Sequence, residues 1–304
     1  MALSATAVTC GSENVSVMGY SIDSSPDSTF AEGASLDRAV DLPSGTHTLH
    51  IKAWGDRGAV CVTDVTVTVK AGRPSAESVG GVPSNAKTVS HLQAMGNWYA
   101  SNDKGAHGRA SGSSKVVSSP AIDGPSRQFV THYVDSGGER YSLDFGDDTE
   151  ATNFFYDAWV YLTSSASDVA NLEMDMNQVM PNGWTVIYGV QCDGYKGTWD
   201  YTVNTGTPDH WHDHWLPSKA RCDLQGWSKN AWHHVEISYS RNDDGKVTYS
   251  SVWLDGVENK MDVTVPSAFA LGWGPHLTTN FQLDGRGKSG SNTVYLGNLT
   301  VSRW

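Results

Sequence analysis

Apolar and polar residues alternate with a period of two along much of this chain. In residues 48–54 this spacing puts Leu49 and Ile51 on one face of an extended segment. Valines recur at the same spacing through residues 59–69, with polar residues between them. Turn-forming residues separate the two runs, as expected for an antiparallel hairpin. The pattern therefore predicts that residues 1–70 form a small β-sandwich.

The same alternation returns from about residue 126. It runs through RQFVTHYV, RYSLDFG, FFYDAWVYLT, ANLEMDMNQV, WTVIYGVQC, WDYTVNT, WHHVEISYS, KVTYSSVWLDGV, TNFQLDG and NTVYLGNLTVSRW. Residues 91–100, HLQAMGNWYA, form the only convincing short helix candidate. Many strands with almost no helical period predict a large antiparallel sandwich or jelly roll.

The intervening residues 71–90, AGRPSAESVGGVPSNAKTVS, are rich in Gly, Pro, Ser and Ala and have no hydrophobic period. Such composition is typical of a linker. We therefore expect an all-β protein with one domain at 1–70, a linker at 71–90 and a jelly roll at 91–304.

Composition agrees with two packed domains and excludes several classes of protein. The 304 residues are 38% hydrophobic and 18% charged, which suits two cores and disfavours a disordered chain or a coiled coil. The 33 Asp and Glu outnumber the 21 Lys and Arg, and no basic run occurs, so nucleic acid is not an expected partner. No apolar stretch is long enough for a membrane span. MALSATAVTC lacks the charged and apolar regions of a signal peptide, which leaves secretion open.

The four cysteines lie two in each half of the chain, and none forms a C-x-x-C pair. The even split favours one disulfide in each domain over a zinc ribbon or a thioredoxin-type site. We expect Cys10–Cys61 and Cys192–Cys222, formed in an oxidising compartment, with reduced buried thiols as the alternative. The protein is therefore expected to be secreted or at the cell surface.

Two segments resemble known β domains. The stretch DLPSGTHTLHIKAWGDRGAVCVTDVTVTV, with its G-x-H-x-L strand, resembles the last strands of bacterial immunoglobulin-like domains. The hairpin NAWHHVEISYSRNDDGKVTYSSVWLDGV, with Trp232 and His233 before Asp255 and Gly256, resembles the concanavalin A-like lectin and glucanase superfamily. The final NTVYLGNLTVSRW resembles the closing strand of that superfamily. The resemblance implies an immunoglobulin-like domain followed by a concanavalin A-like jelly roll, and says little about activity.

The segment LEMDMNQV carries the most informative chemistry. On a regular strand, Glu173, Asp175 and Asn177 share one face, opposite apolar residues that face the core. Two neighbouring carboxyl groups raise each other's pKa, which suits acid–base or nucleophilic work on a sugar. The alternative is a row of solvated polar residues or calcium ligands on an outer face.

The same segment resembles the E-x-D-x-E and E-x-D-x-x-E motifs of laminarinase, lichenase and cellobiohydrolase families. The resemblance implies that Glu173 is the nucleophile and Asp175 its helper. The third position departs from the motif, because it is Asn177 on a regular strand and Gln178 on a bulged one. Neither amide can donate the catalytic proton that a retaining glycosidase requires. The resemblance therefore implies a site that binds sugar and hydrolyses it poorly, unless a group from another strand substitutes.

The segment from Pro208 to Trp215 is a second candidate site. If extended, His210, His212 and His214 would share a face, a geometry that suits zinc or copper. We favour a glycan subsite, because Trp rings stack on sugars while His and Asp bind hydroxyl groups. Other tryptophans near turns extend this expected binding surface, and with the segment they give the candidate residues Trp184, Trp199, Trp211, His212 and Trp215.

We expect an extracellular protein that binds a polysaccharide on the concave face of the jelly roll, through Glu173, Asp175, Asn177 or Gln178 and nearby tryptophans. One alternative is a retaining endo-glucanase or a lyase that uses Glu173 as nucleophile or base, and another is a surface adhesin or structural protein. A third carboxyl group, or the His210–His214 segment, within reach of Glu173 would favour the enzyme. No cofactor is expected, although a structural calcium ion at Asp147–Asp148, at Asp243–Asp244 or near Asp284 stays open.

Overall fold

A computed structural model describes residues 2–25, 29–40, 42, 45–69 and 81–304. The chain divides into two compact units, Met1–Ala76 and Glu77–Trp304. The domain bounds inferred from the sequence stay a prediction. Residues 71–80 of the predicted linker lie outside the described residues. The C-terminal part of the predicted linker contains the strand β8 (Lys87–Val89), which pairs with β23 (Ser289–Arg303) of the second unit.

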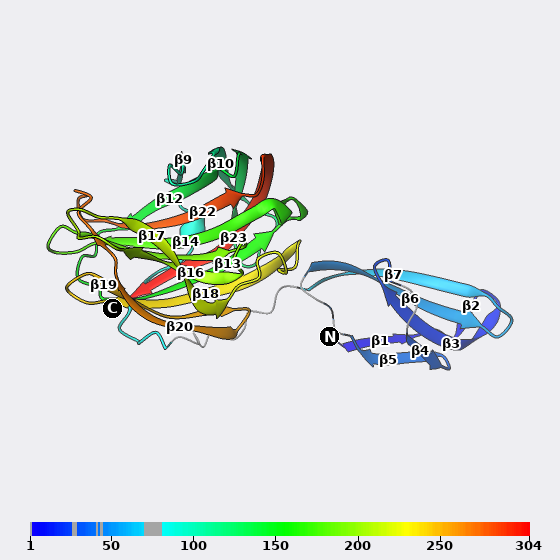
Figure 1. The fold of residues 1–304 in the computed structure, drawn as a ribbon. Coiled ribbons are helices and arrows are strands. Elements are labelled where there is room, and N and C mark those ends of the chain that lie inside the picture. Colours follow the sequence, from blue (N-terminus) through cyan, green and yellow to red (C-terminus); the bar gives the residue numbers. More distant parts are fainter. Residues whose placement is uncertain (1, 26–28, 41, 43–44, 70–80) are drawn as a thin grey trace. The chain divides into compact units, whose positions relative to one another are not determined.

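The first unit consists of short antiparallel strands in two sheets (Figure 1). A five-stranded sheet has the order β2-β3-β6-β7 with β4 beside β3, and β1 pairs with β5. The strand bounds are β1 Ala2–Thr6, β2 Thr9–Cys10, β3 Glu13–Ile22, β4 Thr29–Glu32, β5 Ser35–Ala39, β6 Gly45–Gly55 and β7 Val60–Val69.

The core of the first unit contains Met18, Leu36 and Leu49, which are buried on three different strands. The predicted alternation therefore holds on β6. On β7, by contrast, Val60 and Val62 are exposed. The predicted β-sandwich of residues 1–70 agrees with this arrangement, and its immunoglobulin-like identity stays a prediction.

The second unit consists of two eight-stranded antiparallel sheets that face each other (Figure 1). The β13 sheet has the order β10-β11-β23-β13-β18-β19-β20, with β8 beside β23, and the β14 sheet has the order β17-β16-β15-β14-β22-β12-β9, with β21 beside β15. The remaining bounds are β9 Tyr99–Asn102, β10 Arg109–Val117, β11 Ser126–Val134, β12 Gly138–Gly146, β13 Asn153–Leu162, β14 Val169–Val179, β15 Thr185–Asp193, β16 Thr198–Asn204, β17 Asp213–Arg221, β18 Ala231–Arg241, β19 Lys246–Leu254, β20 Val257–Pro266, β21 Ala268–Phe269 and β22 Leu277–Gly285.

Alternate residues of each sheet meet between the two layers to form one core. Leu172, Met174 and Met176 of β14 are fully buried there, as are Phe154 and Tyr156 of β13. Because side chains on a strand alternate between faces, the residues between these core positions point away from the core. The predicted all-β jelly-roll fold is confirmed, since the described residues contain no α-helix.

The helix predicted at residues 91–100 is wrong. A single 3₁₀ turn covers Leu92–Ala94, and β9 begins at Tyr99. The carbonyl groups that would start a helix are taken by side chains instead. The Trp98 indole donates to the Leu92 carbonyl at 2.9 Å, and Arg127 Nε donates to the Gln93 carbonyl at 2.8 Å. Both bonds occupy carbonyl groups that an α-helix would pair with backbone N–H groups.

Both predicted disulfides are present. Cys10 and Cys61 lie 5.7 Å apart at their Cα atoms in the first unit, and Cys192 and Cys222 lie 5.5 Å apart in the second.

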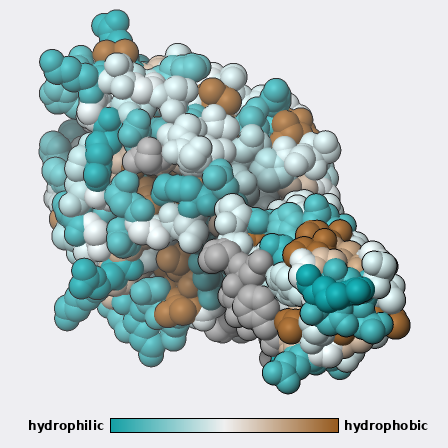
Figure 2. All heavy atoms as spheres, turned by 90° about the vertical axis from the view of Figure 1, so that its right-hand side faces the viewer, coloured by the Kyte–Doolittle hydropathy of each residue, from teal (hydrophilic) through white to brown (hydrophobic). Residues whose placement is uncertain are grey.

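A second 3₁₀ turn covers Ser164–Asp168. On the face in Figure 2, apolar side chains form small separate groups among hydrophilic ones. Within the described residues, no helix has the length and apolar character needed to cross a membrane.

Candidate functional site

The face of the β14 sheet that points away from the core carries polar side chains on adjacent strands. On β14 these are Glu173, Asp175 and Asn177, on the shared face that the sequence predicts. On β22 the residues paired with them are Gln282, Asn280 and Thr278, respectively. Two adjacent strands therefore present carboxyl, amide and hydroxyl groups in register, and such groups can donate to and accept from sugar hydroxyls.

This polar face is the floor of a cleft of about 1080 Å³. The described part of the chain has four exposed aromatic side chains, and all four line this cleft. They are Tyr99, Tyr195, Trp211 and Trp273. Trp215, which is only partly exposed, lines the cleft as well.

Neighbouring rings and charges hold three of the exposed aromatic side chains. Trp211 meets Phe269 edge-on with ring centroids 5.9 Å apart, and Trp273 stacks on His276 at 5.1 Å. The Arg286 guanidinium lies 5.0 Å from the centre of the Tyr195 ring. These rings are supported before any ligand arrives, which reduces the entropy that binding must overcome.

The carboxyl groups of Glu173 and Asp175 form a coupled pair in the floor. Burial, the charge of Asp175 and a hydrogen bond with it raise the pKa of Glu173 well above its usual range. Burial also raises the pKa of Asp175 to about 7, against the lowering effect of the bond with Glu173 and of Arg140. Near neutral pH the pair therefore retains a proton, so one carboxyl group can donate a hydrogen bond while the other accepts one.

Carboxyl groups from other strands join the pair. Asp284 at the end of β22 and Asp103 beside β9 both raise the pKa of Glu173 through their charge. Burial raises the pKa of Asp284 itself to about 6, although Asn171 donates to its carboxylate at 3.0 Å. Asp213 and His214 of β17 line the same cleft. The β14 sheet thus supplies the additional carboxyl groups that the sequence motif itself lacks.

The expectation that Gln178 lies in the site is wrong. β14 has a register shift between Val169 and Asn171 only, so the strand is regular through the motif and Gln178 points into the interior. Its amide donates to the carbonyl groups of Asp148 at 3.1 Å and Ala151 at 2.8 Å. Its oxygen accepts from Arg241 Nε at 2.8 Å and from the Tyr188 hydroxyl at 2.9 Å.

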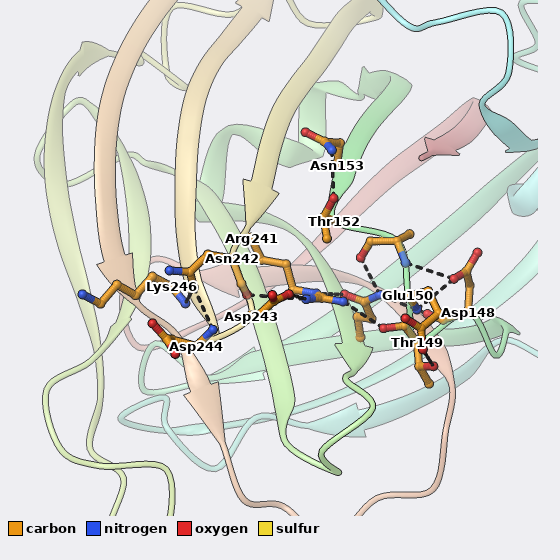
Figure 3. Close-up of polar contacts among 12 residues, drawn as sticks. Asp148, Thr149, Glu150, Thr152, Asn153, Arg241, Asn242, Asp243, Asp244 and Lys246 are labelled. Carbon is orange, nitrogen blue, oxygen red and sulfur yellow. Dashed lines mark hydrogen bonds and ion pairs between the residues drawn. The ribbon is translucent and has the colours of Figure 1, made fainter.

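Figure 3 shows Arg241, a member of this network, whose guanidinium also donates to the Thr149 carbonyl at 2.8 Å. The same view shows the two acidic turns considered for calcium. One Asp148 oxygen accepts the N–H groups of Glu150 and Ala151. The other accepts hydrogen bonds from the Lys87 ammonium and from Arg303 Nε. Hydrogen-bond donors therefore already occupy the Asp148 carboxylate.

Three other predicted ligand-binding residues lie outside the cleft lining. Trp199 is fully buried beside Trp227, and Trp184 packs against the core. Their positions next to Gly or Asp in the sequence suggested exposure, but Trp199 lies within the core and Trp184 is half-buried against it. His212 is exposed and does not line the cleft, so of the five aromatic and histidine residues predicted to bind the glycan, Trp211 and Trp215 do.

The segment of His210, His212 and His214 could be a strand or a loop on its sequence, and the structure does not make it one extended strand. β17 begins at Asp213, and His210 pairs with Thr207 in a turn. Pro208 is the second residue of this turn, a position that its fixed φ favours over a strand. The three imidazole rings therefore do not share a sheet face, and the geometric reason for a metal site in this segment is lost.

Sequence reasoning missed Tyr99, Tyr195, Trp273 and Arg140 as site residues, and it considered Asp284 only for calcium. A signal exists for Trp273, because Gly272-Trp273-Gly274 exposes a large ring between two glycines. The other four come from strands and loops whose pairing with β14 spans long stretches of the sequence. No local pattern brings them together.

No protein-family model matches this chain, and no curated protein matches it. The solved structures similar to it include β-sandwich carbohydrate-binding modules and lectins. One of these structures comes from work on carbohydrate-binding modules of the β-sandwich superfamily. It is 10% identical to this chain, with a TM-score of 0.38, and the match covers 95% of this chain and 86% of that chain. The cellulose-induced protein Cip1 is 16% identical, with a TM-score of 0.40, and the match covers 67% of this chain and 90% of Cip1. Arcelin-5, a lectin-like defence protein from Phaseolus vulgaris, is 12% identical, covers 72% and 98%, and has a TM-score of 0.38. Because these TM-scores are below 0.5, we rest no argument on the alignments.

Proposed function

We propose that the cleft of the second unit binds a glycan. The observation that carries this proposal is the distribution of exposed aromatic rings, because all four in the described part of the chain line one polar cleft. Exposed aromatic residues that gather at one place on a polar surface usually mark a binding site. Flat rings beside carboxyl and amide groups match a sugar, which has an apolar face and a rim of hydroxyl groups.

The proposed contacts divide between the floor and the rim of the cleft. Glu173, Asp175 and Asn177, with the amide groups on β22, would bind hydroxyl groups. Trp211 and Trp273 would stack on sugar rings. The volume of about 1080 Å³ is large enough for several sugar residues, which favours a polysaccharide segment over a monosaccharide.

The charge of the cleft favours neutral or cationic sugars over uronic acids. Six carboxyl groups line it, from Asp103, Asp144, Glu173, Asp175, Asp213 and Asp284. The cationic or titratable basic groups are those of Arg140, His107, His214 and His276. Like charges at short range inside a partly buried cleft repel strongly, so a polyuronate should bind poorly.

Isothermal titration calorimetry with a panel of soluble neutral polysaccharides tests the proposal. Trp211→Ala and Trp273→Ala should each weaken binding about 2- to 13-fold, which corresponds to about 0.5–1.5 kcal/mol for a lost stacking contact. Trp232→Ala, in β18 of the other sheet, is the matched control and should leave affinity unchanged. An absence of binding across the panel, or equal losses in all three variants, would contradict the proposal.

A retaining glycoside hydrolase is the second candidate, and the acidic groups around Glu173 favour it. Glu173 keeps its proton at neutral pH because its pKa is raised well above the usual range, so it would give that proton to the leaving oxygen. Asp284, whose pKa is about 6, is largely ionised at that pH and would attack the anomeric carbon. Reducing-sugar release that is lost in both Glu173→Gln and Asp284→Asn would establish the hydrolase. Binding without release would retain the recognition function alone.

We further propose that the protein works outside the cell or at its surface. Two intradomain disulfides support this location, because such bonds persist in oxidising compartments. Mass mapping of non-reduced peptides from the native source tests it, since free thiols at these four positions would argue for a reducing compartment.

A further inference from the structure

We propose a second, independent site on the opposite sheet, in which Asp157, His234 and Glu236 bind one divalent transition-metal ion of the zinc class. Asp157 lies on β13 and the other two residues on β18, near the middle of the β13 sheet. Asp157 pairs directly with Glu236 across the two strands, and Trp159 pairs with His234. The three residues therefore come from adjacent rigid strands instead of a loop.

These side chains are on the outer face of the sheet. The alternate β13 residues Tyr156 and Ala158 are fully buried between the two sheets. Because strand side chains alternate, Asp157 and Trp159 point the other way. The proposed metal site is therefore separated from the glycan cleft by the whole core of the second unit.

The spacing of the three groups suits one ion. One ligand atom from each residue can be chosen so that all three lie within 4.8 Å of one another. His234 Nε2 lies 2.8 Å from an Asp157 oxygen, and His234 Nδ1 lies 3.7 Å from a Glu236 oxygen. Zinc binds imidazole nitrogen and carboxylate oxygen at about 2.0–2.2 Å. The two carboxylates approach different ring nitrogens, so a shared ion would use one nitrogen, and the carboxylate beside the other would turn toward that ion.

Glu236 gives an independent reason to expect a cation. Its side chain is only 4% exposed, and its one polar side-chain partner in the described part of the chain is the His234 nitrogen 3.7 Å away. That distance is too long for a hydrogen bond. A buried carboxylate without a hydrogen-bond donor is costly, and a coordinated metal ion is one of the few groups that offset the cost.

The surroundings also fix the ligands and leave a route for the ion. Trp159 stacks on the His234 ring with a 4.4 Å centroid separation and a 10° angle. The Asp255 carboxylate accepts the backbone N–H of His234 at 2.8 Å. Asp157 is 34% exposed and so keeps one side open to water. One nitrogen and two carboxylate oxygens with an open side favour zinc or a similar first-row ion over calcium, which binds oxygen ligands only.

Zinc titration of the full chain, after chelator treatment and dialysis, tests this inference. Calorimetry with zinc chloride should show one ion bound per chain. Asp157→Asn and Glu236→Gln should each weaken zinc binding at least about tenfold, since even outer-shell changes cost that much. His212→Ala is the control, because its exposed imidazole belongs to the histidine-rich segment that the sequence alone offers as a metal site. Its affinity for zinc should equal that of the wild type.

Two results of the titration would overturn the site. One is an absence of saturable zinc binding, which would leave the three residues as an ion-paired cluster. The other is binding that survives Asp157→Asn and Glu236→Gln. X-ray absorption at the zinc edge of the wild-type protein gives a readout that does not depend on how the variants fold. It should report one imidazole with carboxylate oxygens, and a shell of several imidazoles would contradict the assignment.

Discussion

Replacing Asp175 by Asn should stabilise the second unit at neutral and alkaline pH while leaving it unchanged in acid. Burial raises the pKa of this carboxyl group from its ordinary 3.8 to about 7, with the coupled Glu173 beside it. One of its oxygens is buried without a hydrogen-bond partner. The folded protein therefore holds the ionised group under unfavourable conditions, and the neutral, isosteric Asn relieves them.

The sign and size of the effect follow from proton linkage. Between pH 4 and 7 the folded state binds a proton that the unfolded state has released, so stability falls as pH rises through this window. The favourable contribution is complete below about pH 4 and lost above about pH 7. One pKa unit corresponds to about 1.4 kcal/mol, so ionised Asp175 costs up to about 4 kcal/mol at pH 8. Domains are stable by only about 5–15 kcal/mol, so the gain in Asp175→Asn should be easy to measure.

Urea unfolding from pH 4 to 8, followed by tryptophan fluorescence, measures this gain. Trp54 is the only tryptophan of the first unit, so the other 11 of the 12 report on the second. Asp255→Asn is the control of opposite sign. Burial acts to raise the pKa of Asp255, but hydrogen bonds from His233 and His234 outweigh it and lower the pKa. That variant should lose stability near neutral pH. Parallel pH profiles for wild type and Asp175→Asn would refute the reasoning.

Such a carboxyl group also bears on function. A buried acid that destabilises the fold at neutral pH has no structural use, and groups of this kind cluster at functional sites. If Asp175→Asn stabilises the protein and weakens glycan binding, both effects come from the same side chain. Stability that rises with no change in binding would remove Asp175 from the proposed site.

The period-two pattern was enough to predict the fold class and the faces of β14. A one-residue shift in the register of a strand would move every side chain to the opposite face of the sheet. Where one face is buried, the alternating pattern therefore determines strongly which side chains face the core. Glu173 and Asp175 could be assigned to the polar face for this reason. The choice between Asn177 and Gln178 could not be made, because a bulge depends on the partner strands. The bulge in β14 precedes the motif and lies between Val169 and Asn171.

The environment of single aromatic residues could not be predicted from their neighbours in the sequence. Trp199 follows a turn, yet it pairs with Cys192 across β15 and β16 and is fully buried. Asp284 approaches Glu173 because β22 lies beside β14, and Arg140 approaches Asp175 from β12, on the far side of β22. Long-range packing sets this strand order. Sequence reasoning therefore located the floor of the cleft and missed most of its walls.

Three further predictions concern the same unit. Removing the Cys192–Cys222 disulfide, which closes a separation of 30 residues, should cost roughly 3 kcal/mol in urea unfolding. A polyuronate should bind at least tenfold more weakly than a neutral polysaccharide in calorimetry, and equal affinities would contradict the acidic cleft. Finally, Gln178→Glu should not create a hydrolase. Its amide donates to two buried carbonyl groups, so a carboxylate there leaves both unpaired and costs about 2 kcal/mol or more in urea unfolding, with no new acid in the cleft. Asn177→Glu is the matched variant, because it adds a carboxyl group to the cleft beside Asp175 on the regular strand, and it should raise reducing-sugar release if Glu173 can act as a nucleophile. Release that rises in Gln178→Glu and not in Asn177→Glu would show that the strand is bulged in solution and that the assignment of faces is wrong.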